Sequence, residues 1–443
     1  MIPMNITRRS FLKTTTVAAI GFPAILRAAN PNSNLQIVAV GCSNKGFSDI
    51  AEIGSHAKVK YVGFCDIDST RFDKADAKFP GVPHFVDARE AFAKLGDTFD
   101  AAIVSTPDHM HAFLALDAMR RGKHVYVQKP LTHTVWEARQ MRLQAAKSKV
   151  ATQMGNQIHS HEAYRTAVKL LRDGAIGKVT AVHAWQGNRG NGYTKLTEPP
   201  SFAPVPETLD WDKWLGVAAH REYAADVYHP RKWRDWQVFG GGTMGDFGCH
   251  ILDPVFTALG IKDPLTIRAD NDGLNPHTWP GAETVSYVFP GTPLTAGKTV
   301  TVTWYDGGRL PEASLFPTLP ADKKMPQAGS LVLGETGALI IPHVAMPELY
   351  LRDSATAPVI EKVAGSSHYH AWVEAALGGP ATTDSFEYAG PLTEAVHLGN
   401  VATRFPGETL VWDAKSLHIT NVKEANTLLT KSYREGWKIE SVA

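Results

Sequence analysis

The sequence of 443 residues contains little cysteine, and its charges nearly cancel. The three cysteines, Cys42, Cys65 and Cys249, are odd in number, lie in apolar or glycine-rich segments and include no C-x-x-C pair. A disulfide framework and a cysteine-based metal site are therefore not expected. The formal net charge of +1 gives no reason to expect nucleic acid or an acidic membrane surface as a partner.

Long apolar runs, internal repeats and low-complexity tracts are also lacking after residue 29. No later segment has the roughly 20 consecutive apolar residues that a membrane-spanning helix needs, so we expect no membrane insertion of the mature chain. With 44% hydrophobic and 20% charged residues, the composition is typical of a globular enzyme. The chain is too long for one ordinary core, and two domains are expected.

The N-terminus has the pattern of an export signal. Residues 7–13 (TRRSFLK) contain a twin-arginine pair, residues 14–26 are largely apolar or small, and Ala28 and Ala29 follow. This order resembles a bacterial Tat signal that is cleaved near these alanines. We expect residues 1–29 to be removed and the mature protein to be periplasmic or otherwise exported.

A dinucleotide-binding turn is predicted near the start of the mature chain. The apolar run 35–40 (LQIVAV) is followed by GCSNKG at 41–46 and by a helix-like segment. In this context Gly41 permits the tight turn and Gly46 permits close packing of helix on strand, with a pyrophosphate at the helix N-terminus. Ser43 replaces the middle glycine of the fingerprint and puts a side chain beside the phosphates.

The next apolar run ends at a carboxylate. Asp66 follows the run 59–65, 20 residues after Gly46, where a dinucleotide fold places the acid that binds the adenine ribose hydroxyls. This carboxylate would repel a 2′-phosphate, which favours NAD over NADP, although nearby Arg71 keeps NADP open. Since NAD is not freely supplied outside the cytoplasm, we expect the cofactor to leave with the folded protein and to be held tightly.

Strands and helices then alternate. Residues 99–106 form a predicted strand that ends before Pro107, the stretch 111–121 is helical, and the run 122–130 contains the next strand. This alternation is typical of a parallel, doubly wound sheet, in which ligands bind beyond the carboxyl ends of the strands. Lys129 lies at one of these ends.

Several motifs resemble those of one enzyme family. Gln128-Lys129-Pro130 stands where the family usually has Glu-Lys-Pro, and residues 240–253 (GGGTMGDFGCHILD) resemble its second signature. The remaining motifs are TPDHMH at 106–111, GKHV at 122–125, GETG at 334–337, FEYAGPLTE at 386–394 and LGNVA at 398–402. From about residue 34 to residue 437 the chain therefore resembles the Gfo/Idh/MocA oxidoreductases, the family of glucose–fructose oxidoreductase and inositol dehydrogenase.

The resemblance implies an α/β architecture. A Rossmann domain with a doubly wound parallel sheet (34–157) is followed by an α/β domain (158–443) with a large, mostly antiparallel sheet, and the last helices pack back on the Rossmann domain. A homodimer or homotetramer is also implied. Alternating polarity supports the second sheet, with strands predicted at 178–185, 265–270, 284–289, 299–304, 330–333 and 338–341. The stretches 187–235 and 306–329 are expected to be loops that cover the site.

The same resemblance implies a catalytic set of Lys129, Asp246 and His250. His250 would accept the hydroxyl proton of a sugar alcohol, since its ordinary pKa is about 6.5. Asp246, on the same face if a helix begins there, would orient the His250 ring. Lys129 would stabilise the developing alkoxide or share the proton transfer. A metal site of Asp246, His250 and Asp253 with a distant histidine is the less favoured alternative, because no compact ligand motif supports it.

Other residues are predicted to bind the ligands. Gln128 keeps hydrogen bonding but removes the family's charge near the ribose and nicotinamide, and Asn156 lies at the expected domain crossover. Tyr228, His229 and His183 are further candidates for acid–base groups. The predicted cofactor site is Gly41, Ser43, Gly46, Asp66, Thr106, Pro107, His111, Gln128, Lys129 and Asn156, the predicted substrate site is Tyr228, His229, Trp233 and Arg234, and no metal is expected.

Two enzymatic functions remain open for such a chain. A sugar or polyol dehydrogenase with tightly bound NAD would oxidise one substrate and reduce another by a ping-pong scheme. An NAD-dependent glycoside hydrolase or lyase would oxidise a ring carbon transiently, eliminate the aglycone and return the hydride. Motifs do not separate reactions on a shared fold. A non-catalytic sugar-binding protein is disfavoured, because Lys129, Asp246 and His250 are all present.

Overall fold

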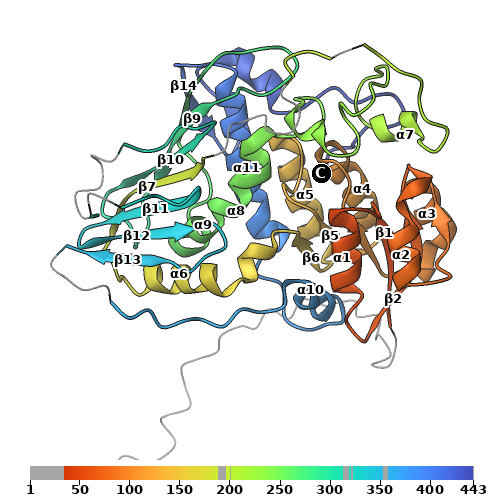
Figure 1. The fold of residues 1–443 in the computed structure, drawn as a ribbon, viewed down its shortest axis with the longest axis horizontal. Helices are drawn as coiled ribbons and strands as arrows, with labels where there is room; N and C mark the ends of the chain where they lie inside the picture. Colours follow the sequence, from red (N-terminus) through yellow and green to blue (C-terminus); the bar gives the residue numbers. More distant parts are fainter. Residues whose placement is uncertain are drawn as a thin grey trace, which may run out of the picture. The chain divides into compact units, whose positions relative to one another are not determined.

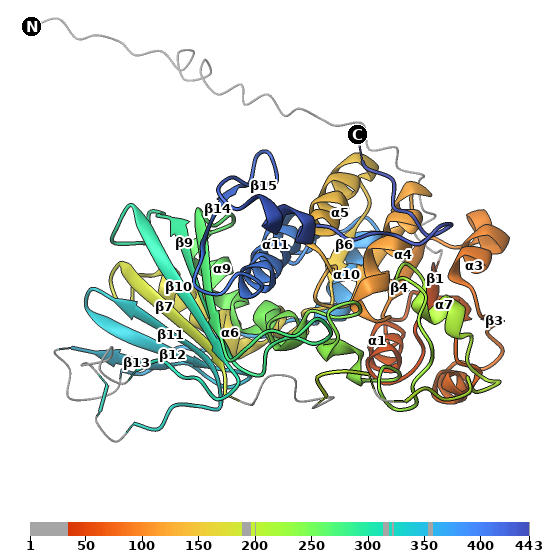
Figure 2. The same ribbon diagram turned by 90° about the horizontal axis from the view of Figure 1, so that it is seen from above.

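The computed structural model describes residues 34–187, 196–199, 201–312, 319–320, 323–352 and 358–442. Within these residues, two β-sheets with their helices make up the fold (Figures 1 and 2). The predicted export signal at 1–29 lies outside the described residues, as do parts of the predicted loops 187–235 and 306–329.

The first sheet is the predicted doubly wound parallel sheet. Its six strands lie in the order β3-β2-β1-β4-β5-β6, and all neighbours pair in parallel. The chain extends the sheet first to one side of β1 and then to the other, so the carboxyl ends of β1 and β4 flank the switch point at which such folds bind ligands. The strands are β1 (Leu35–Val40), β2 (Val59–Cys65), β3 (His84–Phe85), β4 (Ala101–Val104), β5 (His124–Val127) and β6 (Thr152–Met154).

Helices cover both faces of this sheet. They are α1 (Lys45–Ile53), α2 (Asp73–Lys78), α3 (Ala88–Leu95), α4 (Asp108–Arg120), α5 (Val135–Ser148) and, from much later in the chain, α10 (His368–Ala376). Side chains alternate along β1, so Ile37 packs on one face with Ile50 of α1, whereas Val38 packs on the other face with Phe92 of α3. Trp372 of α10 joins the face of Ile37, as expected for a late helix that packs back on the Rossmann sheet.

The second sheet has nine strands in the order β13-β12-β11-β7-β10-β9-β8-β14-β15. β7 and β10 pair in parallel and the other neighbours are antiparallel, which confirms the predicted type of sheet. The short strands β13, β14 and β15 at the two ends of the sheet were not predicted, because two to five residues show too little periodicity. The strands are β7 (Val179–Gln186), β8 (Thr266–Asn271), β9 (Glu283–Pro290), β10 (Thr299–Asp306), β11 (Ala328–Gly334), β12 (Gly337–Pro342), β13 (Glu348–Leu351), β14 (Thr409–Asp413) and β15 (His418–Ile419).

Helix α11 (Phe386–Thr403) lies between the two sheets (Figure 1). It packs on α5 and on β8, and nearly all of its residues are buried, which accounts for a sequence that is apolar on every side. Arg139 of α5 donates two hydrogen bonds of 2.8 Å to Glu394 of α11. In the part of the chain that the structure describes, no helix is both long and apolar enough to cross a bilayer.

The segment that carries the second signature is irregular. Met244–Gly248 (η5) is a π-helix, and α8 (Cys249–Ile251) and α9 (Asp253–Leu259) follow it. A π-helix has i→i+5 hydrogen bonds and occurs frequently at functional sites. Asp246 and His250, which were predicted to share one face if a helix begins there, both lie in this helical segment, Asp246 in its π-helical part and His250 in its α-helical part.

Candidate functional site

A cleft of about 370 Å³ runs along the carboxyl ends of the Rossmann strands. The residues that follow β1, β2, β4 and β5 form one wall of it. Of the predicted cofactor residues the cleft is lined by Gly41, Ser43, Gly46, Asp66, Thr106, Pro107, Gln128 and Lys129, and of the predicted substrate residues by His229, Trp233 and Arg234. The structure thus brings most of the predicted ligand-binding residues onto one surface.

The turn after β1 has the shape that a dinucleotide needs. Gly41 has a φ of +89°, and a Cβ on it would lie 2.4 Å from the carbonyl oxygen of Ser105. A Cβ on Gly46 would lie 2.2 Å from the carbonyl oxygen of Gly41. Both positions therefore require glycine, whereas Ser43 lines the cleft. The N-terminus of α1 faces this turn with backbone N–H groups that can bind a pyrophosphate, so these residues fit NAD.

Asp66 directly follows β2 and lines the cleft. Its carboxylate accepts hydrogen bonds from the backbone N–H groups of Cys42 at 2.8 Å and Asp68 at 3.2 Å. Burial raises the pKa of Asp66 to about 6, because desolvation disfavours the charged form. Arg71, the residue that kept NADP open, donates to the Asp68 carboxylate at 2.7 Å, so its charge is already compensated within the protein.

The raised pKa of Asp66 predicts that NAD binding depends on pH. An ionised carboxylate accepts hydrogen bonds from both ribose hydroxyls, whereas the protonated acid has lost part of this acceptor capacity. We expect the dissociation constant for NAD, measured by calorimetry on NAD-free protein, to rise by about tenfold per pH unit below the pKa of about 6. The Asp66→Asn variant should bind NAD more weakly at neutral pH and without this pH dependence. A wild-type affinity that stays constant across the acid range would contradict ribose binding by Asp66.

Two of the predicted catalytic groups, Lys129 and Asp246, are in direct contact. Lys129 Nζ donates to Asp246 Oδ1 at 2.5 Å and to the Asp246 backbone oxygen at 2.8 Å. Arg234 Nε lies 3.4 Å from the same carboxylate oxygen. The side chains of Lys129 and Asp246 are only 12% and 9% exposed, so little water screens the lysine charge. The arrangement suits stabilisation of a negative charge that develops on a substrate oxygen.

His250 is held by Asn156, and this contact corrects one prediction. Asn156 Nδ2 donates to the backbone oxygen of Cys249 at 3.1 Å, which turns the amide oxygen of Asn156 toward His250 Nδ1 in a short hydrogen bond. Asn156 thus orients the His250 ring, the role predicted for Asp246, and its contact with the cofactor stays a prediction. Because an amide oxygen only accepts, Nδ1 carries the hydrogen and Nε2 keeps a free electron pair.

The electrostatic surroundings keep His250 neutral. Burial and the charge of Lys129 hold its pKa well below the ordinary range, although Asp246 acts in the opposite direction. A neutral imidazole with the hydrogen on Nδ1 is a proton acceptor at Nε2. The geometry therefore suits a general base beside the Lys129–Asp246 pair.

Sequence reasoning missed a second histidine beside His250. His343 follows β12, its ring centroid lies 5.5 Å from that of His250, and its Nδ1 lies 3.0 Å from the hydroxyl of Tyr164 on α6 (Glu162–Arg172). The one available signal was a histidine just beyond a predicted strand. Asp108 was missed as well, although it lines the cleft and burial raises its pKa to about 7.

Gln128, which stands where the family motif has glutamate, is hydrogen-bonded to a buried carboxylate. Gln128 Nε2 donates to Asp49 Oδ2 at 2.8 Å. Asp49 of α1 is fully buried and also accepts from Lys45 Nζ at 2.6 Å and from Ser105 Oγ at 2.8 Å. The carboxylate that the family motif has at position 128 is thus present one hydrogen bond away, on a different element.

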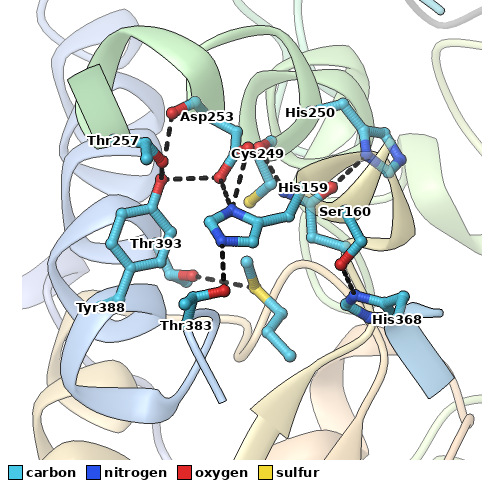
Figure 3. A network of polar contacts seen from close by, with 12 residues as sticks. His159, Ser160, Cys249, His250, Asp253, Thr257, His368, Thr383, Tyr388 and Thr393 are labelled. Atoms are coloured by element: carbon cyan, nitrogen blue, oxygen red, sulfur yellow. Dashed lines mark hydrogen bonds and ion pairs between the residues drawn. The ribbon is translucent and has the colours of Figure 1, made fainter. Parts of the chain in front are cut away.

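A second polar network braces the segment that carries Asn156 (Figure 3). His159, in the 3₁₀ turn Gln157–Ser160, binds the Asp253 carboxylate of α9 at 2.9 Å and Thr383 Oγ1 at 2.9 Å. Burial alone would lower the pKa of His159, but Asp253 raises it to about 9. Tyr388 donates to Asp253 at 2.6 Å. This ion pair ties the turn after Asn156 to the helix that follows His250.

Asp253, the third member of the alternative metal site, is thus bound to His159 and Tyr388. Among the described residues, no group of three or more His, Cys, Asp and Glu side chains is arranged to hold a metal ion.

Three further predicted residues do not line the cleft and contact other protein groups. His111 is buried behind the cleft, with its ring nitrogens 2.9 Å from the Pro130 oxygen and 2.8 Å from the Thr106 oxygen, so it connects two strand ends instead of contacting the cofactor. Tyr228 is 1% exposed within an aromatic cluster and supports the cleft wall without lining it. His183 lies in β7, with Nδ1 3.0 Å from the hydroxyl of Tyr305.

Known proteins match both halves of this architecture. Residues 35–156 match a family model described as an oxidoreductase family with an NAD-binding Rossmann fold, and residues 174–286 match its C-terminal alpha/beta domain. Together the two matches cover more than half of the chain. The dinucleotide of the first domain is therefore NAD.

Individual relatives are distant. The chain is 25% identical over 204 residues to an alpha-N-acetylgalactosaminidase of Shewanella oneidensis, covering 40% of this chain and 44% of that protein. It is 26% identical over 151 residues to a levoglucosan dehydrogenase of Pseudarthrobacter phenanthrenivorans, covering 34% and 30%, so the matches span less than half of these relatives. A solved inositol dehydrogenase homolog of Azotobacter vinelandii, complexed with NADH and myo-inositol, covers 86% of this chain and 98% of its own at 15% identity and a TM-score of 0.59, which shows a shared fold.

Proposed function

The chain belongs to the Gfo/Idh/MocA family of NAD-binding oxidoreductases, and we propose that it oxidises a hydroxyl group of a carbohydrate. The observation that carries this proposal is the contact of Lys129 with Asp246 at the NAD cleft, beside a neutral His250. When bound, NAD supplies the acceptor for the hydride of the carbinol carbon. The protein itself has to bind the sugar, remove the hydroxyl proton and stabilise the oxygen that loses it.

Each of these tasks has a candidate residue. His250 Nε2 accepts the hydroxyl proton, because Asn156 fixes the hydrogen of the ring on Nδ1. Lys129 donates to the alkoxide oxygen as charge develops there. Trp233 and Arg234 line the cleft, and the Arg234 guanidinium lies 4.3 Å from the Trp233 ring centroid. Together they offer a sugar an apolar surface beside hydrogen-bond donors.

Export and assembly are further parts of the proposal. The leader motif at 7–13 supports translocation of the folded protein by the Tat route into the periplasm, and the family resemblance supports a homodimer or homotetramer. Without free NAD outside the cytoplasm, the bound cofactor has to be re-oxidised in place. Either a second carbohydrate accepts the hydride, or the same substrate takes it back.

The second of these cycles is a redox-neutral cleavage of glycosides, the alternative function for this chain. Transient oxidation of a ring carbon would allow elimination of the aglycone, followed by addition of water and return of the hydride. The name of the Shewanella relative, a glycosidase, favours this alternative, whereas the name of the Pseudarthrobacter relative favours a dehydrogenase.

Nucleotide release and product analysis test the proposed function. Purified mature protein is dialysed exhaustively and denatured, and we expect close to one NAD per chain in the supernatant. The NAD-loaded protein is then mixed with free sugars, polyols and p-nitrophenyl glycosides. Reduced cofactor that accumulates until an acceptor is added indicates a dehydrogenase, and p-nitrophenol without a net change in NAD indicates the redox-neutral cycle. Absence of retained NAD would contradict the captive cofactor, and absence of both reactions would contradict the proposed oxidation.

A further inference from the structure

We propose that His343 is a second acid–base residue of this site, which moves the proton of the C–H bond next to the oxidised carbon and equips the site to eliminate an aglycone. The inference rests on the proposed oxidation, because only a carbonyl group makes the neighbouring C–H bond acidic enough for an imidazole base. It favours glycoside cleavage over net oxidation of a free sugar as the reaction of this chain.

His343 reaches the site from the second sheet. Its backbone N–H donates to the Ala328 oxygen at 2.8 Å, which fixes the chain beyond β12 against β11. The His343 and His250 rings have centroids 5.5 Å apart and planes inclined by 39°. Phe247 packs edge-on against His343 at 6.0 Å. At this spacing the two imidazoles can contact neighbouring atoms of one bound sugar.

The charge of Lys129 acts on both rings. Burial and the Lys129 ammonium lower the pKa of His343, and the same two causes lower that of His250. Both rings are therefore neutral near pH 7 and available as bases. Since the charge of Lys129 lowers the pKa of both rings, His343 is close enough to the Lys129–Asp246 pair to be influenced by it, as His250 is.

The two imidazoles differ in the group that forms the hydrogen bond with Nδ1. The amide oxygen of Asn156 only accepts, so the hydrogen of His250 is fixed on Nδ1. His343 Nδ1 instead faces the hydroxyl of Tyr164 at 3.0 Å, and a hydroxyl either donates or accepts. His343 Nε2 is consequently a proton acceptor in one tautomer and a hydrogen-bond donor in the other. In the tautomer that has its hydrogen on Nδ1, Nε2 can accept the proton of a C–H bond and, once protonated, donate it to a leaving oxygen.

The proposed step begins with the ketone form of the substrate. The C–H bond beside the carbonyl breaks, its proton moves to His343 Nε2, and its electron pair forms a C=C bond with the next carbon. The C–O bond of the aglycone on that next carbon breaks, and its electron pair leaves on oxygen, which takes the proton from His343. One unsaturated ketone and one alcohol result, without oxidation or reduction in this step. Addition of water in the reverse sense gives the hydrolysed sugar.

The test uses NAD-loaded mature protein in D₂O with methyl and p-nitrophenyl glycosides of glucose, galactose and N-acetylgalactosamine. Three signals are followed: absorbance of the reduced cofactor, release of p-nitrophenol, and carbon-bound deuterium by mass spectrometry. We expect the wild type to release aglycone and incorporate deuterium. His343→Asn, which keeps a hydrogen-bonding group for Tyr164, should lower both rates by at least about 100-fold and leave cofactor reduction within about fivefold. His250→Asn should lower all three.

The results with the wild type and with His343→Asn distinguish a failure of the role of His343 from a failure of the proposed oxidation. Deuterium incorporation by His343→Asn within about threefold of the wild type overturns the role of His343. Reduction of cofactor by the wild type without deuterium incorporation also overturns it, but leaves the proposed oxidation in place. Absence of both cofactor reduction and aglycone release with all of these glycosides overturns the proposed function and this inference with it. Full NAD content and an unchanged melting temperature of His343→Asn separate a chemical role from a structural one.

A readout without turnover tests the tautomer argument. In NAD-free protein labelled with ¹⁵N-histidine, and assigned with the His343→Asn and His250→Asn variants, we expect His250 to show one tautomer and His343 to show a mixture of two. Tyr164→Phe should change the His343 signal and not that of His250. A His343 held only in the tautomer with its hydrogen on Nε2 would contradict the proposal, because Nε2 could then not accept the proton.

Discussion

The variant Lys129→Met is expected to oxidise its substrate about 1,000-fold more slowly than the wild type. Methionine preserves most of the side-chain length but removes the ammonium group that donates to Asp246 and stabilises the developing alkoxide. Arg234 remains 3.4 Å from the Asp246 carboxylate, so the buried acid keeps a cationic neighbour and the fold should persist. The measurement is the single-turnover rate of cofactor reduction, together with the NAD content of the variant.

The pH–rate profile of Lys129→Met should show a second effect. The lysine charge contributes, after burial, to the lowered pKa of His250 and of His343. Without this charge the pKa of each ring rises, so the acid limb of the profile should move to higher pH. A loss of stability would not produce this movement. If the profile keeps its position and the rate falls by less than tenfold, Lys129 has no direct part in the reaction.

Lys169→Met is the matched control for this variant. Lys169 lies on the surface of α6 and pairs with Asp173, with both side chains about half exposed. The same chemical change at this position should leave the rate and the pH–rate profile as in the wild type. An exposed ion pair contributes little to stability, and water screens the charge of Lys169 from the reacting groups.

Restoring the family glutamate with Gln128→Glu is expected to destabilise the protein at neutral pH by about 3 kcal/mol. The new carboxylate would replace the amide that now donates to Asp49 at 2.8 Å, and both side chains are buried. Two buried carboxylates in contact do not both ionise readily, so one pKa rises in the folded state. Lys45, 2.6 Å from Asp49, offsets only part of the repulsion because it is a single positive charge.

The raised pKa of the new carboxyl group determines how the stability of Gln128→Glu changes with pH. In the unfolded chain the glutamate titrates near its ordinary pKa of about 4.3, whereas in the folded protein it keeps its proton to higher pH. The stability deficit of Gln128→Glu should therefore be small below about pH 4, grow as the pH rises from there to the raised pKa, and level off above it. Melting temperatures of wild type and variant at several pH values measure this difference.

The compensating double variant tests the explanation. Asp49→Asn with Gln128→Glu returns the carboxylate to the family position and removes the repulsion, so it should recover at least about 2 kcal/mol relative to the sum of the single variants. Additive effects of the two substitutions would show that Asp49 and Gln128 do not act as a pair. NAD content measured on the same variants shows whether cofactor retention depends on where this charge lies.

Most of the fold could be predicted from local patterns. The parallel sheet was evident from alternating apolar runs and helical stretches, and six strands of the second sheet were evident from alternating polarity. The glycine turn with Gly41 and Gly46 and the carboxylate of Asp66 could be located, because they depend on spacing along one βαβ unit. The π-helical turn around Asp246 could not, because its backbone geometry depends on packing and not on composition.

The site was predicted less completely than the fold. Lys129, Asp246 and His250 were identified through a family motif, but the partner of His250 was assigned wrongly to Asp246. Asn156, which orients that ring, is 94 positions away. A sequence position does not reveal which of several nearby polar groups a side chain will contact.

Local sequence was sufficient for the order of strands and helices and for the dinucleotide turn, since these follow from periodicity and short-range spacing. Contacts among the reacting groups depend instead on long-range packing. The pair Lys129–Asp246 joins residues 117 positions apart, on segments that follow β5 and precede α8. The pair His343–Tyr164 joins residues 179 positions apart because α6 packs on β12. No local pattern in the sequence predicts these long-range contacts, because they result from burial of one large apolar core that elements from the whole chain share.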